Sequence, residues 1–335
     1  PASDRAKIYA EYLHSTQLGK THDSPYSPPP VLQGLCIAPF QELDHLFIDY
    51  DLLSSIRQFK NGRSAKPNGV PGEVWKLLRD SLELRWDLLN FLNKCLQEGR
   101  LPSSWSKGEV VGLYKKSDPT LPINYRPITL LDTLYKVFTR MLATRLATAV
   151  EPYLRKSQYG FRQRRSTTMA IHVVRRAMEA LAHKKNIDLN IILCDWNKAF
   201  DKVDTSALTD ALTAFGIRGQ FLKVIQATFE SQFRVLGQLG FEDSDYYEQE
   251  TGIRQGCPLS PLLFVLMLSW VMEGADILYK EIGTEEPILP VLDLFYADDT
   301  LLLSTDCIDL QVRFTLIESL AGAVGMTLNR DKTVL

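Results

Sequence analysis

The chain has 335 residues, of which 45% are hydrophobic and 23% are charged. This composition is typical of a globular protein and excludes wholesale disorder, collagen-like repeats and a disulfide-stapled miniprotein. The 38 basic and 40 acidic side chains give a net charge of −2. That balance argues only mildly against a nucleic-acid partner, because local clusters of charge still create strong fields.

The sequence has no uncharged apolar run of roughly 18 residues, the length that a membrane span needs. The longest candidate, Leu259 to Met272, is shorter, and the first residues lack the apolar core of a signal peptide. We therefore expect an intracellular, soluble protein with no membrane partner. The cysteines are scattered and form no CxxC pair, which argues against a zinc site or a disulfide framework.

The first 40 residues are expected to form a peripheral N-terminal extension. A short amphipathic stretch over 6–13 leads into a proline-rich linker at 22–30. Prolines cannot join a helix interior or a central strand, so this linker is expected to lie extended on the surface.

Residues 41–185 carry mainly helical patterns. A turn is expected at 64–72 and a strand at 109–114, and Gly99 stands where a helix C-cap glycine would lie. Apolar residues recur every three or four positions in four segments: 41–60, 73–98, 131–155 and 167–185.

Strands and helices mix over residues 186–335. The apolar run 189–194 is typical of a buried strand and ends in Asp195, and two strands flank a tight turn that holds Asp298 and Asp299. Carboxylates at the ends of two strand segments predict an α+β fold with a catalytic sheet. The expected elements are strands at 189–194, 232–240, 245–251, 289–295 and 301–304, and helices at 205–215, 219–230, 260–276 and 308–324.

Three of these carboxylates form a candidate metal site. Neighbouring like charges repel, and burying them costs several kcal/mol each unless a cation compensates. Asp195, Asp298 and Asp299 on neighbouring strand ends could hold two Mg²⁺ ions ~3.5–4 Å apart, the arrangement used for phosphoryl transfer. The alternative is that Asp298 and Asp299 form only a solvated hairpin turn, where Asp is common.

A basic cluster extends from Arg155 to Lys185, with nine Lys and Arg residues and a single acid, Glu179. Clusters of this kind suit contacts with phosphates. A solvated helix face is the alternative for the charges.

Six segments occur in a fixed order along the chain: Asn124-Tyr-Arg-Pro-Ile128, Gln158-Tyr-Gly-Phe-Arg162, Asp195-Trp-Asn-Lys-Ala-Phe-Asp201, Thr251-Gly-Ile-Arg-Gln-Gly-Cys-Pro-Leu-Ser-Pro-Leu-Leu-Phe264, Tyr296-Ala-Asp-Asp299 and Gly325-Met-Thr-Leu-Asn-Arg-Asp-Lys-Thr333. Together they resemble the signatures of reverse transcriptases of non-LTR (LINE-type) retrotransposons. The resemblance runs from about residue 50 to the end.

The resemblance implies the fingers and palm of a right-hand polymerase, with an antiparallel palm sheet packed on helices. With the N-terminal extension (1–40) inferred above, the predicted division is fingers with an upstream helical region (41–185) and a palm with the catalytic aspartates (186–335). Fingers and palm would form one reverse transcriptase domain. Because the sequence ends just after the last signature, we expect the thumb to be absent from this chain.

The implied activity is that of an RNA-directed DNA polymerase, which transfers a nucleotide from a dNTP to a primer 3′-OH on an RNA template. The implied cofactor is a pair of Mg²⁺ ions, with Mn²⁺ as a substitute. The implied partners are the RNA template, a DNA primer or target DNA, and dNTPs, and family analogy implies the nucleus and the cytoplasm. The alternatives are a group II intron-like reverse transcriptase and a truncated or domesticated core that binds RNA without polymerising.

The resemblance also implies site residues. Asp195, Asp298 and Asp299 would be the catalytic metal ligands, with the Trp196 carbonyl completing a coordination shell. Phe200 matches the aromatic steric gate beneath the incoming sugar, with an ordinary core phenylalanine as the alternative.

The resemblance also implies a set of residues that bind the incoming dNTP. Lys115 and Lys116 compete for one phosphate contact, and Lys332 would assist the pyrophosphate leaving group or else lie on an exposed surface. The whole implied dNTP set is Lys115, Lys116, Arg126, Phe200, Gln255, Gly256 and Lys332.

The resemblance implies template contacts for six basic residues, with Tyr159 and Phe161 able to stack on single-stranded bases. Arg254 would contact a template phosphate or, equally, pair with a surface acid. The set is Arg155, Lys156, Arg162, Arg164, Arg165 and Arg254.

Two segments depart from the family pattern. Lys66-Pro-Asn-Gly69 stands where the family usually has Gly-Pro-Asp-Gly, and Trp196-Asn197 is less usual beside the metal-binding Asp195. Neither departure removes a predicted metal ligand.

Overall fold

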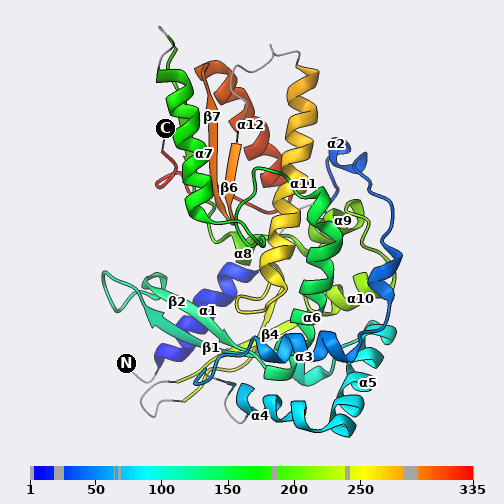
Figure 1. Ribbon diagram of the computed structural model, residues 1–335. Coiled ribbons are helices and arrows are strands. Elements are labelled where there is room, and N and C mark those ends of the chain that lie inside the picture. The colour runs from blue at the N-terminus through cyan, green and yellow to red at the C-terminus, as the bar shows by residue number, and fades with distance from the viewer. Residues whose placement is uncertain are drawn as a thin grey trace. The chain divides into compact units, whose positions relative to one another are not determined.

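The structure of the chain is a computed structural model, shown in Figure 1. It describes residues 4–18, 26–63, 65–66, 69–182, 184, 187–237, 242–282 and 293–334. Five predicted segments lie partly outside these described residues. They are the proline-rich linker, the turn at Lys66-Pro-Asn-Gly69, the helix ending at 185 and the strands at 232–240 and 289–295.

The chain divides into two compact units whose segments interleave along the sequence. Unit 1 contains Pro1–Gly19, Pro39–Ala149 and Ile217–Ser260, and unit 2 contains Lys20–Ala38, Val150–Gly216 and Pro261–Leu335. These boundaries follow contacts within the chain. The division into extension (1–40), fingers (41–185) and palm (186–335) stays a prediction.

Unit 1 contains a four-stranded sheet with the order β2-β1-β4-β5. β1 (Lys107–Tyr114) pairs antiparallel with β2 (Tyr125–Leu130) and parallel with β4 (Ser231–Val235), and β5 (Tyr247–Gln249) pairs antiparallel with β4. The predicted strand at 109–114 and the predicted strand pair near 232 and 247 are therefore present.

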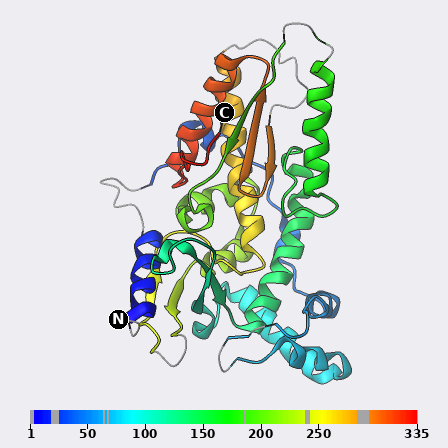
Figure 2. The same ribbon diagram turned by 90° about the vertical axis from the view of Figure 1, so that its left-hand side faces the viewer.

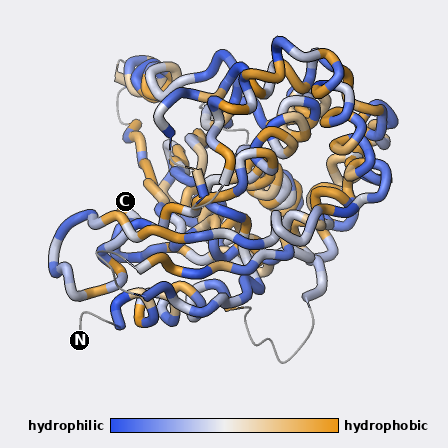
Figure 3. The backbone as a smooth tube through the Cα atoms, turned by 90° about the horizontal axis from the view of Figure 1, so that it is seen from below, coloured by the Kyte–Doolittle hydropathy of each residue, from blue (hydrophilic) through white to orange (hydrophobic). Residues whose placement is uncertain are grey.

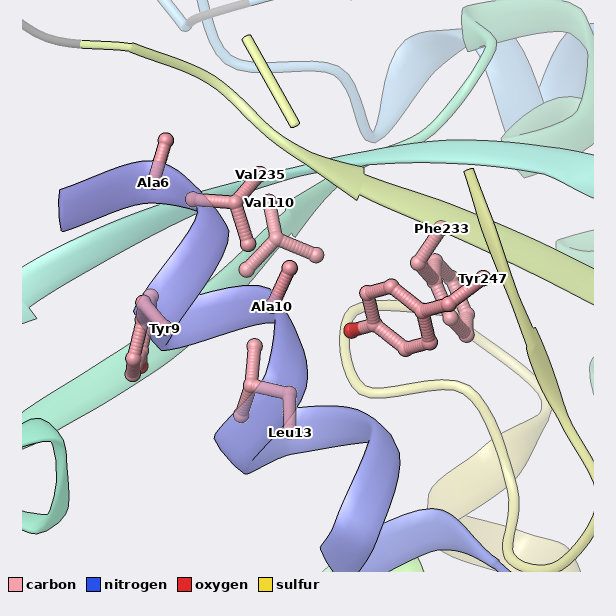
Figure 4. Close-up of a cluster of buried hydrophobic side chains, with 8 residues drawn as sticks. All are labelled: Ala6, Tyr9, Ala10, Leu13, Val110, Phe233, Val235 and Tyr247. Atoms are coloured by element: carbon pink, nitrogen blue, oxygen red, sulfur yellow. The ribbon is translucent and has the colours of Figure 1, made fainter. Parts of the chain in front are cut away.

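Helix α1 (Arg5–Gln17) packs on this sheet. Its apolar residues recur at helical spacing and share one face, and the tube near the N-terminus in Figure 3 alternates accordingly between hydrophilic and hydrophobic segments. Figure 4 shows the resulting cluster, the α1 cluster: Ala6, Tyr9, Ala10, Leu13, Val110, Phe233, Val235 and Tyr247. The N-terminal segment is thus part of a core, whereas we expected a peripheral extension.

The helices of unit 1 are α3 (Asp49–Arg57), α4 (Gly72–Lys76), α5 (Leu82–Glu98), α6 (Thr133–Val150) and α10 (Gly219–Ala227). The single helix predicted over 73–98 is interrupted, because the Ser81 hydroxyl caps α5 by accepting the Leu84 N–H. Gly99 ends α5 with a φ of 62°, as predicted for a C-cap glycine.

Unit 2 contains a three-stranded antiparallel sheet with the order β3-β7-β6. Its strands are β3 (Asn190–Cys194), β7 (Asp299–Ser304) and β6 (Asp293–Tyr296). α7 (Thr167–Ala182) lies on one face, where Ala177 and Leu181 pack with Leu294 and Leu303, and α12 (Cys307–Ala323) lies on the other face (Figure 2). The α+β class with an antiparallel sheet packed on helices is confirmed.

The longest helix is α11 (Ser260–Glu281), and it is long and apolar enough to cross a membrane by length and composition. The sequence was expected to contain no such segment. However, 78% of its most apolar window is buried inside the protein, which is the pattern of a core helix. The remaining helices of the described part of unit 2 are α2 (Pro30–Gln33), α8 (Ala199–Lys202) and α9 (Thr205–Ala214).

The strand β2 was not predicted, because its Pro127 argues against strand structure. The sheet order places β2 at an edge. Proline lacks an N–H donor, but an edge strand can accommodate it when that position faces away from its neighbour.

Candidate active site

One end of the three-stranded sheet carries the three predicted carboxylates. Cys194, the last residue of β3, pairs with Thr300, and Tyr296 pairs with Asp299 across the β6–β7 turn. Asp195 therefore leaves β3 beside the strand that Asp299 begins, and Asp298 lies within the connecting turn. We call Tyr296–Asp299 the acidic turn.

The acidic turn holds an unusual backbone conformation. Ala297 has a φ of 62°, a left-handed value that is uncommon for a residue with a Cβ. Two-residue hairpin turns need positive φ at one or both central positions, and they usually use glycine, asparagine or aspartate there. The hairpin therefore holds Ala297 in a backbone conformation of higher free energy.

The electrostatics of the acidic turn disfavour its full ionisation. Burial raises the pKa of Asp298 above its ordinary value, and the negative charges of Asp299 and Asp195 raise it further, although a backbone hydrogen bond acts in the opposite direction. The predicted like-charge repulsion among these carboxylates is therefore present in the structure.

These carboxylates fit a divalent cation chemically, although they are not arranged as a closed metal site. Among the described residues, no group of three or more His, Cys, Asp and Glu side chains is placed to hold a metal ion. A cation at the acidic turn would offset both the burial of Asp298 and the repulsion from its neighbours. Carboxylate oxygens are the ligands that Mg²⁺ prefers.

The C-terminal segment lies along β3 and contacts the first carboxylate. The Asn329 N–H donates to the Asp195 carbonyl at 2.7 Å, and the Leu193 N–H donates to the Val334 carbonyl at 2.8 Å. These backbone bonds bring the exposed Lys332 ammonium to 3.2 Å from the Asp195 carboxylate. Lys332 therefore lies at the carboxylate site, and its role toward the pyrophosphate leaving group stays a prediction.

Trp196 and Phe200 lie close to Asp195 along the chain and are held by neighbouring side chains. The buried Trp196 indole donates to the Thr300 hydroxyl at 3.0 Å, which ties the end of β3 to β7. The Phe200 ring stacks on Phe264 of α11, with ring centroids 5.0 Å apart. The roles of the Trp196 carbonyl and of Phe200 as a steric gate stay predictions.

The predicted template residues of unit 2 separate into two groups. Lys156 and Arg164 are exposed, and Arg165 lies over the Tyr159 ring. Arg162 is paired with Glu151 at 2.6 Å and its side chain is 5% exposed. The Arg155 guanidinium binds Asp293 at 2.6 Å and Asp276 at 2.7 Å, so it has internal carboxylate partners.

In unit 1 the predicted triphosphate residues lie at the end of the β1–β2 hairpin. Arg126 pairs with Leu113, and the Lys115 N–H continues the ladder by donating to the Asn124 carbonyl at 2.9 Å. Side chains two residues apart on a strand share a face, so Lys115, rather than Lys116, shares a face with Arg126.

The segment with Gln255 and Gly256 also belongs to unit 1. Gly256 has a φ of 94°, and a Cβ there would lie 3.1 Å from the Thr129 carbonyl oxygen, so the position favours glycine. Arg254 is only 3% exposed and donates to the Ser231 hydroxyl and to the carbonyls of Trp105 and Glu230. Neither a phosphate nor a surface acid is its partner; all three nitrogens of its guanidinium are bonded internally.

Comparison with known proteins identifies the family. The sequence model described as "Reverse transcriptase (RNA-dependent DNA polymerase)" matches residues 114–335, which is most of the chain. The chain belongs to the reverse transcriptase family. This confirms the resemblance drawn from the six motifs.

The relatives of this reverse transcriptase chain come from mobile elements. It is 26% identical over 283 residues to "Transposon TX1 uncharacterized 149 kDa protein" of Xenopus laevis, covering 84% of this chain and 21% of that protein. It is 28% identical over 248 residues to the "Retrovirus-related Pol polyprotein from type-1 retrotransposable element R2" of Popillia japonica (73% and 34%). It is 30% identical over 217 residues to the "RNA-directed DNA polymerase from mobile element jockey" of Drosophila melanogaster (63% and 22%). The chain thus spans about a fifth to a third of the length of these relatives, and their names agree with the LINE-type reading.

A solved structure agrees with the fold. The apo telomerase of Candida tropicalis, truncated from its C-terminal domain, matches with a TM-score of 0.51 at 14% identity, covering 73% of this chain and 55% of that one. At this identity the likeness shows the fold of a reverse transcriptase and nothing further.

The reverse transcriptase chain has contacts at the acidic turn that sequence reasoning missed. Gln158 and Gly160 both touch Ala297, although their motif was interpreted only as template handling. The motif was visible in the sequence, but its spatial partner was not, because 139 residues separate Gln158 from Ala297.

Proposed function

We propose that this chain is the catalytic core of an RNA-directed DNA polymerase of a LINE-type retroelement. The observation that carries the proposal is the convergence of Asp195, Asp298 and Asp299 at one end of the β3-β7-β6 sheet. The cost of crowding these charges is typical of a site that binds cations.

The proposed reaction joins a dNTP to a primer. The primer 3′-oxygen attacks the α-phosphorus of the dNTP, a new P–O bond forms, and the bond between the α-phosphorus and the bridging oxygen breaks to release pyrophosphate. Two Mg²⁺ ions, or Mn²⁺, would supply Lewis-acid stabilisation of the attacking and leaving oxygens when bound. Asp195, Asp298 and Asp299 would hold them, with the Trp196 carbonyl as a further ligand.

The other dNTP contacts are proposed from the motifs. Lys332 would assist the pyrophosphate leaving group, and the Phe200 ring would exclude a ribose 2′-OH. Lys115 is favoured over Lys116 for the triphosphate because it shares a face with Arg126, whose guanidinium can bind phosphate oxygens in a bidentate manner. Gln255 and Gly256 would contact the nucleotide.

For the RNA template we propose Lys156, Arg164 and Arg165 as contacts. Lys156 and Arg164 are exposed, and Arg165 with Tyr159 offers a stacked pair on which a base could lie. Arg155, Arg162 and Arg254 are not included, because their side chains are largely buried and bond to internal carboxylates or carbonyls. Arg165 also donates to the Lys156 carbonyl at 2.6 Å, but it is kept because its guanidinium lies over the Tyr159 ring.

A salt titration of RNA binding tests these template contacts. Arg164→Ala should weaken binding for all RNA sequences alike and reduce the slope of log affinity against log salt by about 0.7–1. Arg176→Ala is the matched control, because that guanidinium pairs with Glu179 at 2.6 Å. Equal slopes for wild type and Arg164→Ala would contradict the template surface.

Primer extension on poly(rA)/oligo(dT) with dTTP and Mg²⁺ tests the activity. Wild type and the exposed control Asp188→Ala should extend the primer, whereas Asp298→Ala should lose on the order of 100-fold or more of the rate. Equal rates for Asp298→Ala and wild type would contradict the assigned site. A wild-type chain that binds RNA but never extends the primer would contradict the polymerase and favour an RNA-binding core.

Localisation to the nucleus and cytoplasm is proposed from family analogy alone. Imaging of the chain fused to a fluorescent protein tests it, and retention in any other compartment would contradict it.

A further inference from the structure

The segment Ser157–Gly160 runs beside β6, the strand that leads into the acidic turn. The Phe295 N–H donates to the Ser157 carbonyl at 3.0 Å, and the Tyr159 N–H donates to the Phe295 carbonyl at 2.7 Å. Gln158 and Phe295 accordingly form a parallel bridge. Because these backbone hydrogen bonds fix the register, the residues after Ser157 lie at a defined position along β6, next to the acidic turn.

The Gln158 side chain reaches the acidic turn itself. It is 1% exposed, and its carboxamide oxygen accepts two N–H donors, from Gly160 at 2.8 Å and from Ala297 at 3.3 Å. Ala297 is the residue of the turn with a left-handed backbone. The hydrogen bond therefore acts on the residue whose conformation is unfavourable by itself.

Gly160 allows this close approach. A Cβ at Gly160 would overlap the Ala297 amide nitrogen and would lie 2.8 Å from the Tyr296 carbonyl carbon. Both neighbours are backbone atoms, which cannot move without moving the turn. The glycine is needed for space, and any side chain there would displace Ala297 and with it Asp298.

An ion-pair network fastens the other end of the segment to β6. Asp293 begins β6 and accepts from the Ser157 hydroxyl at 2.5 Å and from the Arg155 guanidinium at 2.6 Å and 3.1 Å. Arg313 also reaches Asp293, at 3.2 Å. The segment is thus fixed to both ends of the strand that carries the acidic turn.

We propose that Gln158 is a positioning residue that keeps Ala297 in its left-handed conformation and thereby sets the place of Asp298, with Gly160 providing the space. This inference rests on the proposed polymerase function for its kinetic consequence only. The structural part, that the Gln158 carboxamide holds the turn, concerns the chain itself and is testable without catalysis.

Amide hydrogen exchange measured by mass spectrometry gives that test. Gln158→Met keeps the side-chain length and removes the acceptor oxygen, so the peptide that covers Phe295–Asp299 should exchange at least about tenfold faster than in wild type. Gln163→Met is the matched control, since Gln163 is exposed and lies in the same stretch. Unchanged exchange in the turn of a folded Gln158→Met would overturn the proposal.

Steady-state kinetics separates positioning from general stability. Gln158→Met should lower kcat for dTTP incorporation by on the order of tenfold, with KM changed less than about threefold. Adding Ala297→Gly should recover part of the loss, because glycine adopts positive φ without strain. A loss that Ala297→Gly does not recover, with faster exchange throughout unit 2, would show a structural role only and overturn the proposal.

A second variant covers the case in which Gln158→Met does not fold. Gly160→Ala leaves Gln158 unchanged and places a Cβ against the Ala297 amide nitrogen, so it should also speed exchange at the acidic turn. Wild-type exchange there in a folded Gly160→Ala would overturn the proposal. If wild type does not extend primers but Gln158→Met still loosens the turn, the polymerase proposal fails and the positioning contact stands.

Discussion

Two regions of the molecule bury their side chains in opposite ways. The α1 cluster in unit 1 joins Ala6, Ala10 and Leu13 to apolar side chains of the sheet, and hydrophobic burial lowers the free energy of the folded state. The acidic turn in unit 2 places Asp298 beside two like charges and holds Ala297 at positive φ, which raises that free energy. Costs of this kind are typical of functional sites, and this contrast is what supports the proposed role of the acidic turn.

The largest expected effect, on the rate of primer extension, comes from removing one of the crowded negative charges at the acidic turn. Asp298→Asn keeps the shape of the side chain and removes one of the crowded charges. We expect primer extension to fall by on the order of 100-fold or more, while the free energy of unfolding rises by about 0.5–2 kcal/mol. Primer extension and urea unfolding of the same preparation measure both. A variant that is active, or less stable than wild type, would contradict the contrast between the two regions.

The ion-pair network at Asp293 should behave in the opposite way, because here the charges are paired. Burial raises the pKa of Asp293, but the hydrogen bonds and charge of Arg155, with Ser157 and Arg313, outweigh it and leave the pKa below its ordinary value. Asp293→Asn should therefore reduce the free energy of unfolding at pH 7 by about 3–5 kcal/mol, since it removes the most buried carboxylate of the network and leaves Arg155 and Arg313 to share Asp276.

The same pKa shift predicts a pH dependence. Because the folded-state pKa of Asp293 lies below the unfolded-state value, its stabilisation is complete above about pH 4 and is lost as the pH falls through the folded-state pKa. Urea unfolding at pH 7 and pH 3 should show a smaller difference for Asp293→Asn than for wild type and for the exposed control Asp188→Asn. An equal loss of unfolding free energy between pH 7 and pH 3 in all three proteins would be inconsistent with a paired Asp293.

A third change tests the apolar region. Leu13 is 5% exposed in the α1 cluster, and Leu13→Ala should cost about 2–4 kcal/mol of unfolding free energy, with faster amide exchange in α1. Leu18→Ala is the matched control, because Leu18 is 39% exposed just after the helix. Equal stabilities of the two variants would mean that α1 does not dock on the sheet in solution.

The smallest expected change in unfolding free energy comes from a helix cap that lies outside both regions. The Asp306 carboxylate caps α12 by accepting the N–H groups of Ile308 at 2.7 Å and Asp309 at 3.0 Å. Asp306→Ala should lower the free energy of unfolding by about 1 kcal/mol and leave primer extension near the wild-type rate. A clear loss of primer extension in a folded Asp306→Ala would indicate that α12 contributes to the site.

The parts of the site that sequence reasoning predicted are local ones. An apolar run followed by Asp195, and two apolar strands around Asp298 and Asp299, identify strand ends because side-chain alternation and turn residues act over a few neighbouring positions. The register of β3, β7 and β6 then brings these ends together. Gly99 was predictable for the same reason, since a C-cap glycine depends on one helix end.

Basic residues show where that reasoning stops. Residue type and motif suggested phosphate contacts for Arg155 and Arg254. In the structure Arg155 pairs with carboxylates from other elements, and Arg254 donates to backbone carbonyls inside unit 1. A guanidinium suits a phosphate, a carboxylate or a carbonyl equally well by type, so only its surroundings in the fold select the partner.

The family, the order of the motifs and the strand–turn–strand frame of the three aspartates could be predicted from the sequence, because these features depend on residues adjacent in the chain. The packing of α1 into a core and the contact of Gln158 with Ala297, 139 positions further along the chain, arise only in the folded protein. The reason is physical: a hydrogen bond or an apolar contact acts over a few ångströms, and distances of that kind between distant segments exist only once the chain has folded.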